Sequence, residues 1–165
     1  MKIASISELK RELKERSQEE IMDFCMRVVK FKKENKELLN YLLFEAYDEE
    51  NFKEALKSEI EDEFATMNIN SVYLAKKSIR RILRITAKHI KYSGSKQTEA
   101  ELLIFFCREM RKLRLPFYKS KVLINLYDRQ LNNIQKSLAT LDEDLQFDYS
   151  NDFEEINKSL PRLIY

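Results

Sequence analysis

The 165-residue sequence is poor in the residues that form tight turns, with one glycine and two prolines. Average usage gives about 12 glycines and about 8 prolines at this length. An all-β fold needs glycine at hairpin turns with positive φ, and a phosphate-cradling loop needs several glycines together. The composition excludes both. With 44% hydrophobic and 35% charged residues, it favours a charged, all-α globular chain.

Histidine and cysteine are also scarce. His89 is the only histidine, which excludes the paired Glu-x-x-His sets of di-iron bundles and the HExxH motif of metalloproteases. Cys25 and Cys107 lie in apolar runs, too far apart in sequence for a CxxC redox or zinc motif. We therefore expect free thiols, no metal and no cofactor.

Long hydrophobic runs are absent. No stretch reaches the roughly 18 consecutive apolar residues of a membrane span, so we expect no membrane partner. Residues 1–14 alternate charged and apolar side chains and lack the basic-then-apolar order of a secretion signal. We therefore expect a cytoplasmic protein.

Helix starts are marked by side chains that cap the free N–H groups of a first turn. Three pairs have the spacing of a capping box: Ser5 with Glu8, Ser17 with Glu20, and Thr98 with Glu101. Weaker start signals lie at Asn35, Asp48 and Ser71 and near Pro116. Together with apolar periodicity, these signals predict helices over residues 5–16, 17–33, 35–47, 49–66, 71–92, 98–113 and 117–138.

The predicted connections are short, which makes neighbouring helices antiparallel. The predicted fold class is all-α, with antiparallel helical hairpins that form a bundle or a short α-α superhelix of about six to seven helices. We expect a single helical domain over residues 1–140 and an acidic and aromatic C-terminal segment over residues 141–165. Ser150 is placed to cap a short helix there, which Pro161 ends. The segment is either a partly ordered tail or docked on the basic middle of the chain.

Two helices have informative apolar patterns. Leu102–Cys107 is apolar at six consecutive positions, so this helix is expected to be buried on all sides. The next helix has apolar residues at a period of 3.5: Ile124, Tyr127, Leu131, Ile134, Leu138, Leu141 and Leu145. Packing on a neighbouring helix of the same chain is the favoured explanation, and a seam in a homodimer is the alternative.

The net charge of +2 hides an uneven distribution. Residues 1–64 carry a net charge of −5, residues 65–136 carry +12 and residues 137–165 carry −5. A positive middle attracts an anionic partner or the acidic ends of its own chain. Composition does not choose between these two.

Six cations of the 71–92 helix fall within about 100° of the helical wheel, opposite its apolar side. We call them the basic row: Lys77, Arg80, Arg81, Arg84, Lys88 and Lys91. The favoured interpretation is a face that is solvated or paired within the protein, and the alternatives are a nucleic-acid surface or an acidic protein partner. Further cations follow on the next two segments, and Tyr92, Phe117 and Tyr118 are candidates to stack on bases beside them.

The stretch Arg84-Ile85-Thr86-Ala87-Lys88-His89 is similar to the R-x4-6-H motif of the HEPN ribonucleases. The resemblance implies an all-helical domain that cleaves RNA, often across a dimer. Arg84 would hold the phosphate while His89 moves the proton of the 2′-hydroxyl.

Three functions follow from these patterns. The first is a non-catalytic protein-interaction or scaffold module, whose partner is an unknown protein or a second copy. The second is nonspecific nucleic-acid binding through the basic row, and the third is an HEPN-like ribonuclease. Apart from that resemblance we expect no catalytic residue, so the sequence favours a protein that is not an enzyme.

Overall fold

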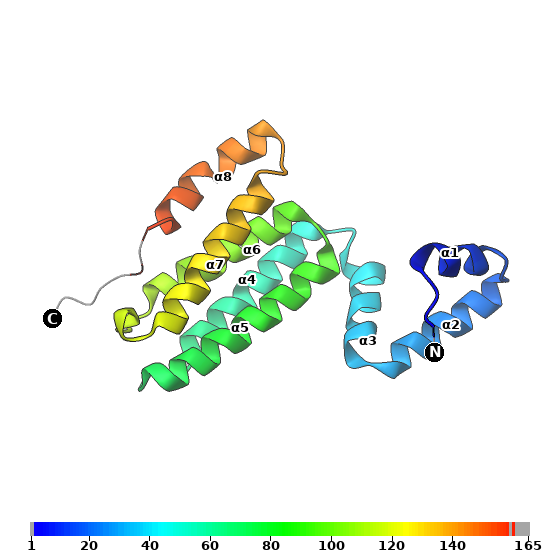
Figure 1. Cartoon of the computed structure of the whole chain (residues 1–165), viewed down its shortest axis with the longest axis horizontal. Coiled ribbons are helices and arrows are strands. Elements are labelled where there is room, and N and C mark those ends of the chain that lie inside the picture. Colours follow the sequence, from blue (N-terminus) through cyan, green and yellow to red (C-terminus); the bar gives the residue numbers. More distant parts are fainter. Residues whose placement is uncertain (1, 159, 161–165) are drawn as a thin grey trace. The chain divides into compact units, whose positions relative to one another are not determined.

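The computed structural model describes residues 2–158 and 160, and these form helices without any strand (Figure 1). The α-helices are α1 (Ile6–Lys14), α2 (Gln18–Phe31), α3 (Lys33–Asn40), α4 (Glu49–Thr66), α5 (Val72–Ser93), α6 (Lys96–Lys112), α7 (Lys121–Leu138) and α8 (Glu143–Ile156). A π-helical turn, η1 (Tyr41–Glu45), follows α3, and a 3-10 turn, η2 (Phe117–Lys119), precedes α7. The all-α prediction is confirmed, with eight α-helices in the described chain against the six or seven predicted.

The two N-terminal capping boxes form as predicted. The Ser5 N–H donates to Glu8 at 2.7 Å, and the Ser17 N–H donates to Glu20 at 2.9 Å. Each serine hydroxyl in turn accepts from the N–H of its glutamate. Such reciprocal bonds satisfy donors that a first turn leaves open, so these two starts are set locally.

α6 begins before the predicted cap at Thr98. Its N-cap is Ser95, whose hydroxyl accepts from the Thr98 N–H at 3.2 Å. Gly94 ends α5 in the left-handed region, at φ 67°, and this tight ending brings Ser95 into the capping position. The Thr98 hydroxyl instead donates to Glu49 of α4 at 2.6 Å. The capping box predicted at Thr98 is therefore wrong.

Two other predicted starts are also wrong. α3 begins at Lys33, and Asn35 lies in its first turn, where its amide donates to the Val28 carbonyl at 2.7 Å. α8 begins after Asp142, whose carboxylate accepts from the Leu145 N–H at 2.9 Å. Ser150 lies inside α8 and does not cap it, because its hydroxyl donates to a carbonyl of the preceding turn.

The described chain divides into two compact units, and the boundary lies between Phe44 and Glu45. In the first unit, α2 packs against α3, and Tyr41 is the only buried side chain among residues 2–44. The single helical domain expected over residues 1–140 stays a prediction.

α6 is the central helix of the second unit. Leu102, Leu103, Ile104, Phe106 and Cys107 are buried on it. The helix packs against α4, α5, α7 and α8, and Figure 1 shows α4, α5 and α6 side by side. The expectation that this segment is surrounded is confirmed.

The 3.5-residue pattern stops where α7 ends, at Leu138. Tyr127 and Ile134 from this pattern are buried within the chain's own core. α8 then packs on α6 and α7, and the Tyr127 hydroxyl donates to the Ile156 carbonyl at 2.6 Å. The C-terminal segment is therefore docked as far as it is described, while Pro161, its expected end, lies outside the described residues.

Candidate functional site

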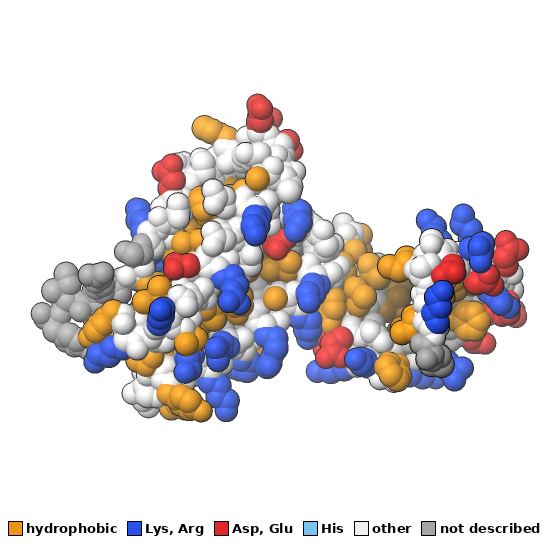
Figure 2. Space-filling model, in the orientation of Figure 1, with side chains coloured by type: hydrophobic (Ala, Val, Ile, Leu, Met, Phe, Trp, Pro, Cys, Tyr) orange, Lys and Arg blue, Asp and Glu red, His pale blue; other side chains and the backbone are white. Residues whose placement is uncertain are grey.

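The basic row lies along the outer face of α5. The helix is amphipathic because Ala75, Ile79, Ile82 and Thr86 are buried on its inner side. Five members of the row are exposed and one is half-buried: Lys77, Arg80, Arg81, Arg84 and Lys91 are exposed, and Lys88 is half-buried. Figure 2 shows Lys and Arg side chains gathered over the face where α5 and α7 lie.

Only part of the row has partners within the described chain. Arg81 forms a two-pronged ion pair with Glu63 of α4. The Lys88 ammonium lies 6.0 Å from the centre of the Tyr92 ring. No ion pair with a described carboxylate forms at the remaining members, which are Lys77, Arg80, Arg84 and Lys91.

The acidic C-terminal segment docks on α6 and α7 rather than on the basic row. Asp152 and Glu155 of α8 lie 3.0 and 2.9 Å from Arg108 of α6. Arg111 donates to the Lys158 carbonyl at 2.9 Å. Asp152 and Glu155 of α8 therefore neutralise a cation of α6 rather than the basic row.

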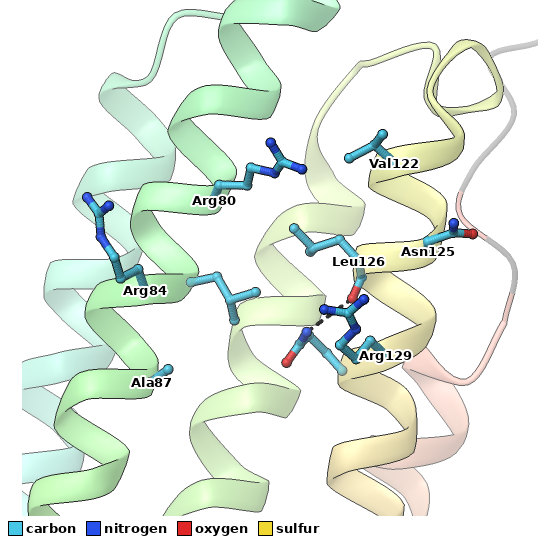
Figure 3. Close-up of a pocket in the computed structure, with 9 residues that line it drawn as sticks. Arg80, Arg84, Ala87, Val122, Asn125, Leu126 and Arg129 are labelled. Carbon is cyan, nitrogen blue, oxygen red and sulfur yellow. Dashed lines mark hydrogen bonds between the residues drawn. The ribbon is translucent and has the colours of Figure 1, made fainter.

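A groove of about 410 Å³ runs beside the row, between α5 and α7. Figure 3 shows Arg80 reaching from α5 toward α7 and Leu126 pointing back toward α5. Arg129 of α7 lines the same groove, and so do the apolar side chains of Leu83, Ala87 and Val122. The groove thus combines a cationic rim with an apolar floor.

Sequence reasoning missed Arg129 and Tyr73. Val122, Leu126 and Arg129 share one face of α7 at helical spacing, but which helix that face meets depends on packing. On the other side of the row, Tyr73 is 68% exposed, with the Lys76 ammonium 5.4 Å from its ring centre. The expected stacking role of Phe117 is wrong, because this ring is 1% exposed.

Arg84 and His89 point to different sides of α5. Arg84 is exposed and lines the groove, whereas the His89 ring lies 6.1 Å from Phe52 of α4 and 5.5 Å from Tyr92. Five residues along a helix amount to a turn of about 140°. Within one chain these two side chains therefore do not face a common substrate, and the HEPN-like activity stays a prediction.

A second charged cluster joins α4, α6 and α8. The Lys53 side chain is 3% exposed, and its ammonium lies 2.7 Å from both Glu101 and Glu50. Burial opposes the charge of Lys53, yet hydrogen bonds to these two carboxylates raise its pKa. Lys57 and the Tyr149 hydroxyl also donate to Glu101, at 2.6 and 2.8 Å. Because these charged groups pair with one another, the cluster holds α4, α6 and α8 together.

Among the described residues, no group of His, Cys, Asp and Glu side chains is arranged to hold a metal ion. None of the helices in residues 2–158 combines the length and the hydrophobicity needed to cross a lipid bilayer. Comparison with protein-family models, curated proteins and solved structures finds no match to this chain.

Proposed function

We propose that this protein binds the phosphate backbone of nucleic acids, without cutting it, through the basic row of α5. The observation that carries the proposal is the exposure of Lys77, Arg80, Arg84 and Lys91 along one face with no carboxylate partner in the described chain. Like charges one helical turn apart repel each other. A polyanion laid along the row relieves this repulsion.

The length of the row suits a phosphate backbone. From Lys77 to Lys91 the helix rises about 21 Å. One strand of a duplex carries a phosphate about every 3.4 Å of axis, so about six phosphates lie along this distance. The described residues form no strand and no zinc site to read bases, and we therefore propose binding without sequence specificity.

The free cations set the expected salt dependence. The four members of the row that have no carboxylate partner in the described chain, with Arg129 beside them, neutralise up to five phosphates. Counterion release then gives a slope of log affinity against log salt of about −4.5 for duplex and about −3.5 for single strands.

The test is fluorescence anisotropy with labelled oligonucleotides of about 20 nucleotides, titrated from about 50 to 200 mM salt. The double variant Lys77→Glu/Arg84→Glu is expected to lose binding. The control Lys136→Glu/Arg114→Glu changes the net charge equally but at exposed positions outside the row and the groove. If the wild type fails to bind at low salt, or if both variants lose affinity equally, the proposal is wrong.

The same assay addresses catalysis. We propose that labelled RNA stays intact during long incubation with the wild-type protein. Cleavage that disappears in His89→Ala while binding persists would instead support the HEPN-like activity.

The exposed apolar side chains of the first unit, which ends at Phe44, favour a second function, which is protein interaction. One face of α2 carries Ile21, Phe24, Val28 and Phe31, which are 36%, 44%, 57% and 78% exposed. Among residues 2–44 only Tyr41 is buried, and short helices without a buried face are marginal in water. This unit therefore gains stability from a partner that covers its apolar face.

We propose that the partner is a second copy of the chain. The first half of α2 carries Glu19, Glu20 and Asp23, and the second half carries Arg27 and Lys30. A two-fold axis near the middle of α2 places the acidic half of one copy against the basic half of the other. The same antiparallel pairing brings the apolar faces together.

Both free cysteines suit the reducing cytoplasm, which we propose as the location.

Light scattering coupled to size exclusion tests the self-association. Arg27→Glu is expected to shift the protein from dimer to monomer, and adding Glu20→Arg is expected to restore the dimer. Because Glu20 also completes the cap at Ser17, Glu8→Arg is the control, since it removes the equivalent bond at Ser5. A wild-type mass of one chain, or a charge-swapped variant no more dimeric than Arg27→Glu, would refute the proposal.

A further inference from the structure

The groove between α5 and α7 differs chemically from the row beside it. Its floor is formed by Leu83 and Ala87 of α5 and by Val122 and Leu126 of α7. These side chains are half-buried, except Val122, which is 40% exposed. A groove that only attracted phosphates would have no use for an apolar floor, because phosphates stay hydrated or paired with cations.

We infer that this groove receives an unpaired base, so that the protein prefers single-stranded to double-stranded nucleic acid; the inference rests on the proposed function. In a duplex the bases are stacked inside, so that their flat faces are covered and only their edges, the sugars and the phosphates face the protein. A duplex on the basic row therefore covers its cations but leaves the floor of the groove in water. A single strand can turn a base out and bury both surfaces.

The size and the rim of the groove suit such a base. Its volume of about 410 Å³ lies in the range of about 300–1,000 Å³ that is usual for small-ligand sites. Arg80 belongs both to the row and to the rim, so one strand can follow the row and enter the groove without leaving its cations. The planar guanidinium groups of Arg80 and Arg129 stack on a base or pair with its phosphate.

Little in the groove reads the identity of a base. The amide of Gln130 is already engaged, because it donates to the Leu126 carbonyl at 3.1 Å and its oxygen lies 3.4 Å from the Asn133 amide. Asn125 is the exposed amide on the rim. The groove is therefore expected to accept any base, and RNA and DNA alike.

The experiment compares a labelled single strand with the same sequence as a duplex, at one salt concentration, with RNA and DNA arms. We expect the wild type to bind the single strand about 10-fold more tightly. Leu126→Gln, which makes the floor polar, is expected to lose this preference while duplex binding is unchanged. Leu74→Gln is the matched control, because Leu74 is a 38% exposed leucine of α5 outside the groove.

A second variant guards against misfolding of the first. Ala87→Phe fills the groove without removing apolar surface or charge, and it is also expected to abolish the preference. Equal affinity for the two forms, or a preference that survives in both groove variants, would overturn the inference while leaving backbone binding intact. Failure to bind either form would overturn the proposed function itself. Displacement of the strand by an acidic helical peptide, with no preference for single strands, would assign the groove to a protein ligand instead.

Discussion

Replacing Glu101 with leucine is expected to destabilise the protein strongly, because it leaves the ammonium of Lys53 buried with one partner fewer. Lys53 is 3% exposed, and its remaining carboxylate partner, Glu50, is 76% exposed. Removing one member of a buried ion pair costs about 3–5 kcal/mol. Because Glu50 still offers one bond, we expect the lower end, about 3 kcal/mol.

Urea denaturation followed by far-UV circular dichroism measures this loss. The double variant Lys53→Met/Glu101→Leu is expected to recover part of the stability, since it removes the buried charge together with its partner. Glu54→Leu is the control, because the Glu54 carboxylate is 67% exposed and its pair with Lys57 contributes at most about 1 kcal/mol. A loss below about 1 kcal/mol in Glu101→Leu, or a double variant as unstable as the sum of the single ones, would refute the reasoning.

Three other predictions follow from single sites. Burial opposes ionisation of Glu101, but hydrogen bonds from Lys53, Lys57 and Tyr149 outweigh it and lower the pKa below the ordinary 4.5. The stability that ionised Glu101 contributes is therefore complete above pH 4.5 and is lost as the pH falls through its lower folded-state pKa. The urea midpoint of Glu101→Gln should therefore change less between neutral and acid pH than that of the wild type. Gly94→Ala is expected to lower stability by about 1 kcal/mol in thermal melts, because φ is 67° there. Mass spectrometry after brief alkylation of the native protein is expected to find one adduct, at exposed Cys25, because burial raises the pKa of Cys107 to about 12.

Local signals predicted most of the helices, because caps and periodicity act within a few residues. The boxes at Ser5 and Ser17 need only their own first turn, and both form. Thr98 has the same spacing to Glu101 but is drawn into a bond with Glu49, 49 positions away in the sequence. The helix begins earlier, with its cap at Ser95, and the Glu101 carboxylate accepts from Lys53 and Lys57 of α4 instead of bonding back to a cap. The spacing of Thr98 and Glu101 carries no information about either.

The candidate site also has one part that could be predicted from local sequence and another that depends on packing between helices. The basic row was predictable as a row because all of its members lie on one helix, where the period alone places them. Its pairing was not predictable, since the bond between Arg81 and Glu63 of α4 depends on how the two helices pack. The groove with Arg129 depends on how α5 and α7 lie across α6, which is a matter of packing between helices.

The basic row lies on one uninterrupted helix, so it tolerates substitutions among its residues better than insertions or deletions in α5. Exchanging lysine for arginine at Lys77 or Arg84 keeps a cation in its place. Inserting one residue near Ile82, however, turns everything beyond it by about 100°. Such an insertion would carry Lys88 and Lys91 away from the line of the earlier cations and turn buried Thr86 away from the core. We therefore expect natural variants of this protein to drift in residue type along α5 and to keep its span constant.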